Sequence, residues 1–411
     1  MSMSESIAPE NARVACVALN VPIDKTFDYE IPEHLRGRVV VGGRVRVPFG
    51  PRPSVLGYCV NLKMESPLAN ARMKPVKKSL DEEPIFTPDM LKLARWMAQY
   101  YCCAWGEALH AALPAAVRAA RKRRKIWTAA LDIPAEDVEE KADEIFDKSP
   151  AQAKILRALG AAGAVTLDGE SPVTIAEIKR KTGTSISSFK SLARKDLIAM
   201  EKQVVDADDP LTHVRAEPVE PPALTPQQKT AQQMIVNSAR GGDFGVVLLH
   251  GVTSSGKTEV YLQSIAEVTR EGRQAIVLVP EISLTPQTVR HFSGRFRRLA
   301  VLHSHLTEAE RRNQWNMIRR GEADVVIGAR SAIFAPVPDL GLLIIDEEHE
   351  NSFKQDNVPR YHARDVGIMR ARYEGATVVL GTATPSLESY YNTRVGKYKL
   401  ARLTERIGNL P

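Results

Sequence analysis

A loop with the composition of a phosphate cradle stands near the middle of the chain. Residues 251–258 read GVTSSGKT and fit the pattern G-x-x-x-x-G-K-[ST], after an apolar run and before a helical segment. The backbone N–H groups of such a loop bind nucleotide phosphates, its lysine reaches the β and γ oxygens, and its last hydroxyl binds Mg²⁺. The pattern therefore predicts ATP and Mg²⁺ as ligands. The candidate nucleotide-binding residues in the loop are Gly251, Ser255, Gly256, Lys257 and Thr258.

Two adjacent carboxylates end a second apolar run, LLIIDEEH. At the carboxyl end of a buried strand, Asp346 would hold the Mg²⁺ together with Thr258, and Glu347 would polarise the attacking water. The alternative for this pair alone is an exposed acidic turn. A third run, VVLGTATPS, places two threonines after a strand, and the order of the three segments is that of helicase motifs I, II and III. The candidate catalytic residues are Lys257, Asp346, Glu347, Thr382 and Thr384.

These segments belong to a regular pattern that begins at Leu224. Short runs rich in β-branched residues alternate with helical segments, which is typical of a parallel sheet covered on both faces. Ligands of such sheets bind at the carboxyl ends of the strands, so the phosphate loop and the carboxylates are predicted to meet there. The runs are FGVVLLHG, AIVLVPE, LAVLHSH, ADVVIGA, LGLLIIDEEH and ATVVLGTATP.

The first hundred or so residues have a different pattern. The short alternating runs RVACVALN, FDYEIP, GGRVRVPFG and SVLGYCVNLKM, punctuated by Pro and Gly, predict an all-β module. A helix follows in TPDMLKLARWMAQYY, with Thr87 as its N-cap and Pro88 at its first position. Residues 118–125 then form a basic run, for which a solvated linker is the favoured interpretation.

Residues 150–205 have the outline of a winged helix: helix, short helix, turn, helix and strand. The short helix is predicted to end at Gly183. Many modules of this kind contact only protein, so DNA contact and protein contact both stay open. Residues 206–222 are acidic and proline-rich, which indicates a domain boundary. The basic side chains available to phosphates are Lys190, Arg194 and Lys195.

Composition limits the class of protein. A length of 411 residues predicts two or three domains, and 44% hydrophobic with 26% charged residues is typical of a soluble globular protein. No apolar run approaches the ~18 residues needed to cross a bilayer, and the N-terminus lacks a secretory pattern, so a cytoplasmic protein is expected. The net charge of +7 suits a polyanionic partner. The four cysteines form no C-x-x-C pair and indicate neither a zinc site nor a disulfide framework.

Longer stretches resemble the PriA family, the bacterial replication-restart helicases of superfamily 2. The matching segments are PIDKTFDYEIP, VGGRVRVPFG, EEPIFTP, VPEISLTPQ, HSHLTEAERRNQW, IGARSAIFAP, DEEHENSFKQ, PRYHARDVGIMRA and GTATPSLES, from about residue 14 to the end. The resemblance implies a multidomain protein. Its parts would be a small all-β domain binding 3′ DNA ends over 1–112, a basic linker with a winged-helix domain over 113–205, a linker over 206–222, and a RecA-like α/β helicase lobe 1 over 223–411.

For the first module, the resemblance implies a pocket for the 3′ end of a nascent DNA strand. The pocket would be formed by Phe27, Asp28, Gly42 and Lys74. There a ring can stack on the terminal base, a carboxylate can accept from the free 3′-OH, and a lysine can meet the adjacent phosphate. The alternative is that Phe27 belongs to the core and Gly42 to a turn.

For the helicase lobe, the resemblance implies further contacts. Gln228 would recognise adenine through an amide that pairs with both N6 and N7, and Gln227 is a neighbouring candidate. Arg330 would contact a DNA phosphate. An aromatic-rich loop would sense single-stranded DNA and report to the carboxylate pair, although ordinary packing is the alternative for these residues. The loop residues concerned are Phe353, Tyr361 and His362.

The phosphate loop departs from the family at one position, where Ser254 replaces the usual glycine. If that position needs a positive φ, serine costs about 1 kcal/mol of strain. Recombinase-type loops also carry Ser-Ser before Gly-Lys, so nucleotide binding is still expected.

The family implies an ATP-dependent 3′–5′ DNA helicase that recognises stalled forks and D-loops and initiates primosome assembly. The sequence stops where the second helicase lobe of the family would begin, and arginines from that lobe are worth about 10³ to 10⁵ in rate. We therefore expect this chain to bind DNA and ATP without unwinding DNA alone. Zn²⁺ would belong only to a C-terminal region of the family that is absent here. The expected partners are forked DNA with a 3′ end, single-stranded DNA, single-stranded-DNA-binding protein and primosome components at the bacterial nucleoid.

A second class of function is kept as the alternative: a stand-alone protein that binds forks and recruits primosome partners without motor activity. DNA-stimulated ATP hydrolysis separates the two. An ABC-type or GTPase protein is disfavoured, because neither L-S-G-G-Q nor N-K-x-D occurs in the chain.

Overall fold

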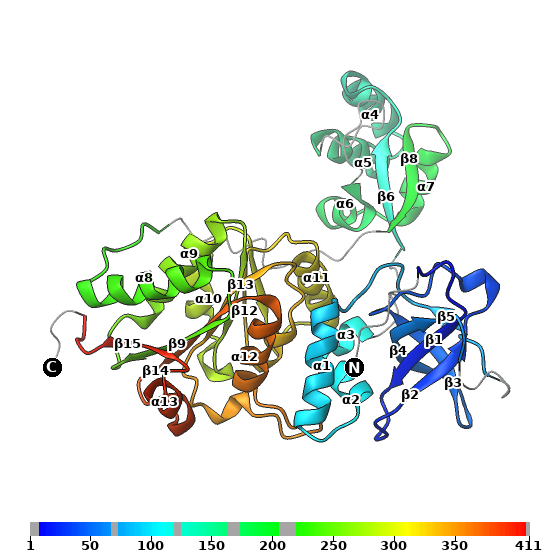
Figure 1. Ribbon diagram of the computed structural model, residues 1–411. Helices are drawn as coiled ribbons and strands as arrows, with labels where there is room; N and C mark the ends of the chain where they lie inside the picture. The colour runs from blue at the N-terminus through cyan, green and yellow to red at the C-terminus, as the bar shows by residue number, and fades with distance from the viewer. Residues whose placement is uncertain (1–7, 67–72, 119–124, 163–172, 205–218, 408–411) are drawn as a thin grey trace. The chain divides into compact units, whose positions relative to one another are not determined.

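The computed structural model describes residues 8–66, 73–118, 125–162, 173–204 and 219–407 (Figure 1). The basic run at 118–125, apart from its two end residues, and most of the boundary at 206–222 lie outside these ranges. The chain forms two compact units, one comprising residues 1–120 and 209–411 and the other residues 121–208. Within the described ranges, every helix is too short or too polar to cross a membrane.

The first module is built on a five-stranded antiparallel sheet with the order β2-β1-β4-β3-β5. Alternation of apolar and polar residues gives this sheet a buried face, on which Val17, Tyr29 and Val45 pack in one cluster. The four runs predicted as strands are confirmed. The strands are β1 (Val14–Leu19), β2 (Thr26–Glu30), β3 (Arg44–Phe49), β4 (Arg52–Lys63) and β5 (Lys78–Ser79).

Helices α1 (Pro88–Tyr100), α2 (Trp105–Ala112) and α3 (Ala115–Arg118) follow the sheet. The predicted start of α1 is confirmed, because the Thr87 side chain accepts a hydrogen bond from the backbone N–H of Met90. Helix α2 lies directly on β1, since a Cβ atom at Gly106 would stand only 1.8 Å from the carbonyl oxygen of Leu19. Only glycine allows two backbones to approach so closely.

In the described part of the unit of residues 121–208, four helices pack against a three-stranded antiparallel sheet of order β7-β6-β8. The three predicted helices and the last strand are confirmed, and the short helix ends at Gly183 with φ +67°. Helix α4 and strands β6 and β7 were not predicted. The elements are β6 (Lys125–Leu131), α4 (Val138–Phe146), α5 (Pro150–Ala161), β7 (Val173–Thr174), α6 (Ile175–Thr182), α7 (Ile186–Ala193) and β8 (Ile198–Val204).

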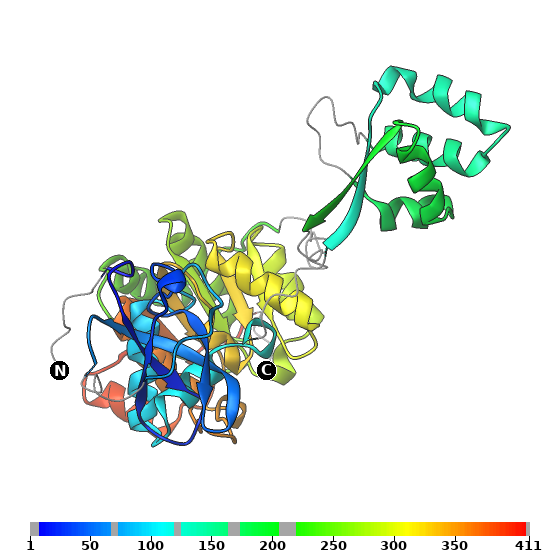
Figure 2. The same ribbon diagram turned by 90° about the vertical axis from the view of Figure 1, so that its right-hand side faces the viewer.

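The C-terminal part is a seven-stranded parallel sheet of order β11-β12-β10-β13-β14-β9-β15 (Figures 1 and 2). All six predicted runs form strands, whereas the edge strand β15 was not predicted. The strands are β9 (Gly245–Gly251), β10 (Gln274–Leu278), β11 (Leu299–Leu302), β12 (Val325–Gly328), β13 (Leu340–Ile345), β14 (Thr377–Thr382) and β15 (Lys399–Leu403).

Both faces of this sheet are buried, as the continuous apolar runs predicted. Along β13, Leu342 and Ile344 pack with α8, α9 and α10, while Leu343 and Ile345 pack with α11 and α12. The second of these cores also contains residues of α1, so the first module and the parallel sheet share it. The helices are α8 (Pro226–Arg240), α9 (Lys257–Arg270), α10 (Pro286–Ser293), α11 (Glu308–Arg319), α12 (Ala363–Glu374) and α13 (Leu387–Arg394).

The close approach of α2 to β1 gives a stability prediction. Gly106→Ala is expected to lower the free energy of unfolding by about 3 kcal/mol, because a methyl group has no space against the Leu19 backbone. The control is Gly241→Ala, where the nearest atom to an added Cβ, the Ser238 carbonyl oxygen, lies 3.6 Å away. Urea unfolding measures both variants. Equal midpoints for the two would contradict the packing described here.

Candidate functional site

Three neighbouring strands bring the predicted motifs to one edge of the parallel sheet. Strand β14 lies between β9 and β13, and all three run in the same direction, so their carboxyl ends meet. The loop after β9 leads into α9 and carries Lys257, and the segment after β13 carries Glu347. The Lys257 Nζ atom lies 3.6 Å from Glu347 Oε1. The structure thus places the lysine of the phosphate loop beside the carboxylate pair.

The phosphate loop has a conformation that depends on two residues with positive φ. Gly256 has φ +77°, and Ser254 has φ +64°. The condition stated from the sequence is therefore met: Ser254 occupies a left-handed conformation that costs a residue with a side chain about 1 kcal/mol. Its carbonyl accepts a hydrogen bond from the backbone N–H of Ile407 at 2.9 Å, which helps to hold the loop in this shape.

One polar group of the loop lacks a hydrogen-bond partner, and a second has partners that a phosphate could replace. The Ser255 hydroxyl is buried and has no hydrogen-bond partner among the described residues. The Lys257 ammonium, on a side chain that is only 10% exposed, donates to the carbonyl of Gly251 at 3.0 Å. Because buried polar groups are normally satisfied, this arrangement suits a ligand rich in oxygen. The loop residues therefore fit nucleotide phosphates.

Asp346 is a half-buried carboxylate at the end of β13. Its Oδ1 atom accepts a hydrogen bond from the Tyr261 hydroxyl at 2.9 Å. Burial, reinforced by the adjacent Glu347 carboxylate, raises the pKa of Asp346. Asp346 and Thr258 line the same cavity of about 200 Å³, so a carboxylate and a hydroxyl group of the kinds that bind Mg²⁺ border one space. The pair proposed as metal ligands from the sequence is brought together.

A hydrogen-bonded pair joins the carboxylate segment to the end of β14. His349 Nδ1 lies 2.8 Å from Thr382 Oγ1, and His349 Nε2 lies 3.5 Å from Thr384 Oγ1. His349 Nδ1 also lies 3.8 Å from Glu347 Oε2. Glu347 has φ +48°, an uncommon value for a residue with a side chain. The two threonines therefore reach the carboxylate pair through His349, which the sequence analysis did not single out.

Glu348 was also missed, and it is the most connected side chain of the segment. It is fully buried and accepts hydrogen bonds from Arg364 Nη1 at 2.9 Å, from the Ser386 backbone N–H at 2.7 Å and from the Ser389 hydroxyl at 3.0 Å. These donors satisfy a carboxylate that would be costly to bury without partners. The sequence DEEH contained a signal for this residue, because a third acidic residue directly after a buried strand needs hydrogen-bond donors.

The amides proposed to recognise adenine are both engaged within the protein. Gln228 Oε1 accepts from the Thr225 backbone N–H at 2.9 Å, and its Nε2 donates to the carbonyl of Ser255 at 2.9 Å. This residue closes a capping box at the start of α8 and holds the phosphate loop. Gln227 Nε2 donates to Thr404 Oγ1 at 3.0 Å. Both glutamines line one small cavity beside the loop.

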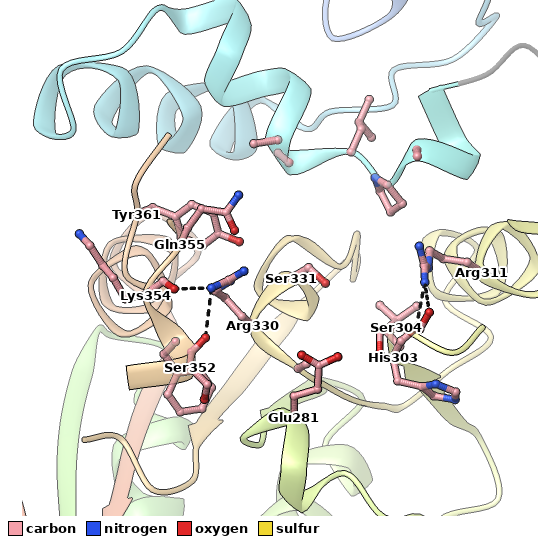
Figure 3. A pocket seen from close by; sticks show the side chains of 18 of the residues that line it. Glu281, His303, Ser304, Arg311, Arg330, Ser331, Ser352, Lys354, Gln355 and Tyr361 are labelled. Carbon is pink, nitrogen blue, oxygen red and sulfur yellow. Dashed lines mark hydrogen bonds between the residues drawn. The ribbon is translucent and has the colours of Figure 1, made fainter. Parts of the chain in front are cut away.

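A cavity of about 990 Å³ lies in the same compact unit, between the segment 111–118 and several loops of the parallel sheet (Figure 3). Arg330 Nη1 reaches across to the carbonyls of Ser352 and Lys354, and Arg311 donates to the carbonyls of His303 and Ser304. None of the basic side chains of the cavity forms an ion pair with a carboxylate within the described part of the chain. These basic residues are Arg118, Arg311, Arg330 and Lys354.

The aromatic-rich loop borders this cavity, but its rings are packed inward. Phe353 and Tyr361 are only 1% and 3% exposed, and Tyr361 makes an edge-to-face contact with Phe334 at 5.3 Å. Burial raises the pKa of Tyr361 to about 12. His362 caps α12, and its backbone N–H donates to the Tyr101 hydroxyl at 3.1 Å. Phe353 and Tyr361 therefore pack in the core, as the alternative stated for these residues described, and their contact with single-stranded DNA stays a prediction.

In the first module, Phe27 and Asp28 lie on the edge strand β2, and Lys74 lies beside Glu30 at the end of that strand. Phe27 packs against Phe49 with ring centroids 5.1 Å apart, and the carbonyl of Lys74 accepts from the backbone N–H of Glu30. The Asp28 carboxylate accepts hydrogen bonds from three side chains, and the Asp28 side chain is only 10% exposed. The donors to Asp28 are Cys16 Sγ at 2.9 Å, Lys63 Nζ at 3.3 Å and Ser66 Oγ at 2.7 Å.

The assignment of Gly42 to this pocket is corrected. Its N–H donates to the carbonyl of Cys59 on β4, and β1 lies between β4 and β2, so Gly42 is separated from Phe27. Gly42 is buried with φ +82°, and an added Cβ would stand 2.3 Å from the carbonyl oxygen of Phe86. It serves a tight turn, which is the alternative that spacing alone had left open.

Known proteins similar to this chain match it along most of its length. A family model of the 3′DNA-binding domain (3′BD) of PriA matches residues 16–114, and a DEAD/DEAH box helicase model matches residues 225–393. The replication restart protein PriA of Bacillus subtilis is 37% identical over 94% of this chain and 55% of its own length. The protein of that name from Haemophilus influenzae is 35% identical over 97% of this chain and 52% of its own length.

The chain therefore spans about half the length of the curated relatives it matches. Among solved structures, RecG bound to a three-way DNA junction is similar over 47% of this chain and 25% of its own, at 28% identity and a TM-score of 0.36. The sequence relatives carry the assignment, since their similarity extends through both compact units and not only through the helicase motifs. On these grounds the chain belongs to the PriA family of replication restart proteins.

Proposed function

We propose that this protein is an ATP-dependent 3′–5′ DNA helicase of replication restart, which recognises stalled forks and D-loops and initiates primosome assembly. The observation that carries the motor part is the 3.6 Å approach of Lys257 to Glu347 at the carboxyl edge of the sheet. Membership of the PriA family supports the role in restart. The protein would act in the cytoplasm, at the bacterial nucleoid.

Each side chain of the ATP site has a distinct task in this proposal. The Lys257 ammonium leaves the Gly251 carbonyl and binds the β and γ phosphate oxygens, where charge develops. Thr258 and Asp346 hold the Mg²⁺, which neutralises phosphate charge when it is bound. Glu347 orients the attacking water and accepts its proton. Gln228 and Gln227 border the space for adenine.

The hydrogen bonds described above would pass the state of the nucleotide to DNA. A shift of Glu347 reaches Thr382 and Thr384 through His349, because all three lie within contact distance of that imidazole. Glu348 binds Arg364, which begins α12 directly after the aromatic-rich loop. Release of that loop would expose Phe353, Tyr361 and His362 to bases, as the resemblance implies.

Two places in the same compact unit suit DNA. The large cavity carries four basic side chains without carboxylate partners in the described ranges, and such charges attract a phosphate backbone. Arg330 is the central one, since it also fixes the aromatic-rich loop. At β2, a 3′-OH would displace the Ser66 hydroxyl from Asp28, with Phe27 under the base and Lys74 near the phosphate.

The unit of residues 121–208 would act as a winged helix that contacts DNA or a partner protein. Lys190 and Arg194 lie at the end of α7, whereas Lys195 donates to Gln152 Oε1 at 2.9 Å and is partly committed to packing. Single-stranded-DNA-binding protein and primosome components are the protein partners that a restart role requires.

The first test of this function concerns nucleotide binding. Lys257→Ala is expected to weaken the binding of a fluorescent ATP analogue with Mg²⁺ roughly 10- to 100-fold, because a hydrogen bond to a charged group contributes about 1.5 to 3 kcal/mol. Fluorescence titration of the 411-residue chain measures this affinity. The matched control is Lys229→Ala on the exposed side of α8, for which the affinity should stay unchanged. Equal affinities for Lys257→Ala and the unsubstituted chain would refute the ATP site.

The second test concerns the 3′ end of DNA. The chain is expected to bind a fork with a free 3′-OH about tenfold more tightly than one ending in a 3′-phosphate, because the Asp28 carboxylate accepts from the hydroxyl and repels the phosphate. Although burial raises the pKa of Asp28, hydrogen bonds from Cys16, Ser66 and Lys63 outweigh that effect and keep the carboxyl group ionised. Asp28→Asn should abolish the preference, and the exposed control Glu30→Gln should retain it. Loss of the preference in both variants would argue against a specific role for Asp28.

A further inference from the structure

Tyr261 is a buried side chain that none of the assigned roles uses. It lies on α9, the helix that follows the phosphate loop, and only 1% of it is exposed. Its hydroxyl donates to Asp346 Oδ1 at 2.9 Å. Tyr261 stands three residues after Thr258, so both project from the same face of α9. Both residues line the cavity that Asp346 also borders.

The neighbouring strand β14 has a glycine, Gly381, where the Tyr261 hydroxyl lies against it. An added Cβ atom at Gly381 would stand 1.6 Å from the Tyr261 hydroxyl oxygen and 3.3 Å from Asp346 Oδ1. Glycine at this position therefore lets the phenol pass between β14 and the carboxylate. The hydroxyl thus occupies a fixed place among α9, the end of β13 and β14.

A carboxylate that binds Mg²⁺ has to present one oxygen in a narrow range of directions, since Mg²⁺ demands near-ideal octahedral geometry. Groups that hydrogen-bond a metal ligand fix its orientation, and their removal typically costs 10- to 100-fold in metal affinity. The Tyr261 hydroxyl occupies Oδ1 of Asp346 and in this way limits rotation of the carboxylate. It comes from the helix that also provides Thr258, the other proposed ligand.

We propose that Tyr261 is a positioning residue for Mg²⁺: its hydroxyl fixes the Asp346 carboxylate in the orientation that binds the ion, and Gly381 provides the space for it. The inference rests on the proposed ATP site and deepens it. Tyr261 itself contacts neither the ion nor the nucleotide. Removal of the Tyr261 hydroxyl should lower the affinity for Mg²⁺ and leave the direct contacts of Lys257 with phosphate intact.

The test uses the 411-residue chain and a fluorescent ATP analogue, titrated with MgCl₂ at fixed nucleotide and also measured in EDTA. Tyr261→Phe keeps the ring and removes only the hydroxyl. The Mg²⁺ concentration at half-maximal binding is expected to rise roughly tenfold. The affinity in EDTA should stay within about twofold, because the phosphate loop is unchanged.

Tyr29→Phe is the matched control, because its buried hydroxyl donates to the carbonyl of Pro48 at 3.0 Å in the first module. This variant should leave the Mg²⁺ midpoint unchanged. Gly381→Ala adds a methyl group against the hydroxyl and should raise the Mg²⁺ midpoint as Tyr261→Phe does. The melting temperature of each variant shows whether it is folded, and a folded Tyr261→Phe chain gives a valid result even where Gly381→Ala does not fold.

The outcomes separate this inference from the function on which it rests. An unchanged Mg²⁺ midpoint in Tyr261→Phe, with Mg²⁺-dependent binding by the unsubstituted chain, would overturn the role of Tyr261 and leave the ATP site standing. An equal loss of affinity with Mg²⁺ and in EDTA would show a general structural effect and would likewise overturn the inference. If the unsubstituted chain shows no Mg²⁺-dependent binding, the ATP site fails and the inference fails with it.

Discussion

The approach of the Lys257 ammonium to the Glu347 carboxylate is the contact on which the proposed motor function depends. It exists because β9, β14 and β13 are adjacent and parallel, so that segments far apart in the sequence end at one edge. A one-sided sheet could not hold this edge rigidly. Here helices bury both faces, and alternate residues of each strand enter different cores, which fixes the register of the strands and hence of the side chains that follow them.

Buried polar side chains connect this edge to the rest of the unit. Glu348, which is fully buried, and Arg364, which is largely buried, form an ion pair. Removal of one partner of such a pair strongly destabilises the protein. Arg364 follows the aromatic-rich loop and donates to Glu348, and Arg330 donates to carbonyls of that loop, so the loop lies between the carboxylate segment and the large basic cavity. In the function proposed above, this loop would make DNA affinity depend on the bound nucleotide.

The sequence predicted the regular elements well and individual contacts less well. Apolar runs and the Thr87 cap signal local structure directly, so the six central strands and α1 were placed correctly. The edge strand β15 was missed because one side of an edge strand lacks a neighbour, and KLARL mixes exposed and buried residues without the continuous apolar run of the central strands. Gly42 was misplaced because a tight turn and a ligand pocket both favour glycine. Tyr261 has no motif signal, since its role arises from three elements meeting in space.

The aromatic-rich loop shows a further limit of motif reasoning. Its residues were expected to sense single-stranded DNA, with ordinary packing as the alternative, and Phe353 and Tyr361 are buried in the core shared with α1. An aromatic ring is equally suited to stacking on a base and to packing in a core, so residue type alone does not separate the two. The position of the loop at the basic cavity follows from the fold and was not visible in the spacing of its residues.

The central claim is that the phosphate loop and the carboxylate pair share one magnesium nucleotide. A crystal structure of this chain with an ATP analogue and Mn²⁺, located by its anomalous signal, tests that claim most directly. The account predicts one ion at about 2.1 to 2.2 Å from the Thr258 hydroxyl and within reach of Asp346, with Lys257 moved from the Gly251 carbonyl to phosphate. A nucleotide bound away from the loop, or an ion without Thr258 and Asp346 nearby, would contradict it.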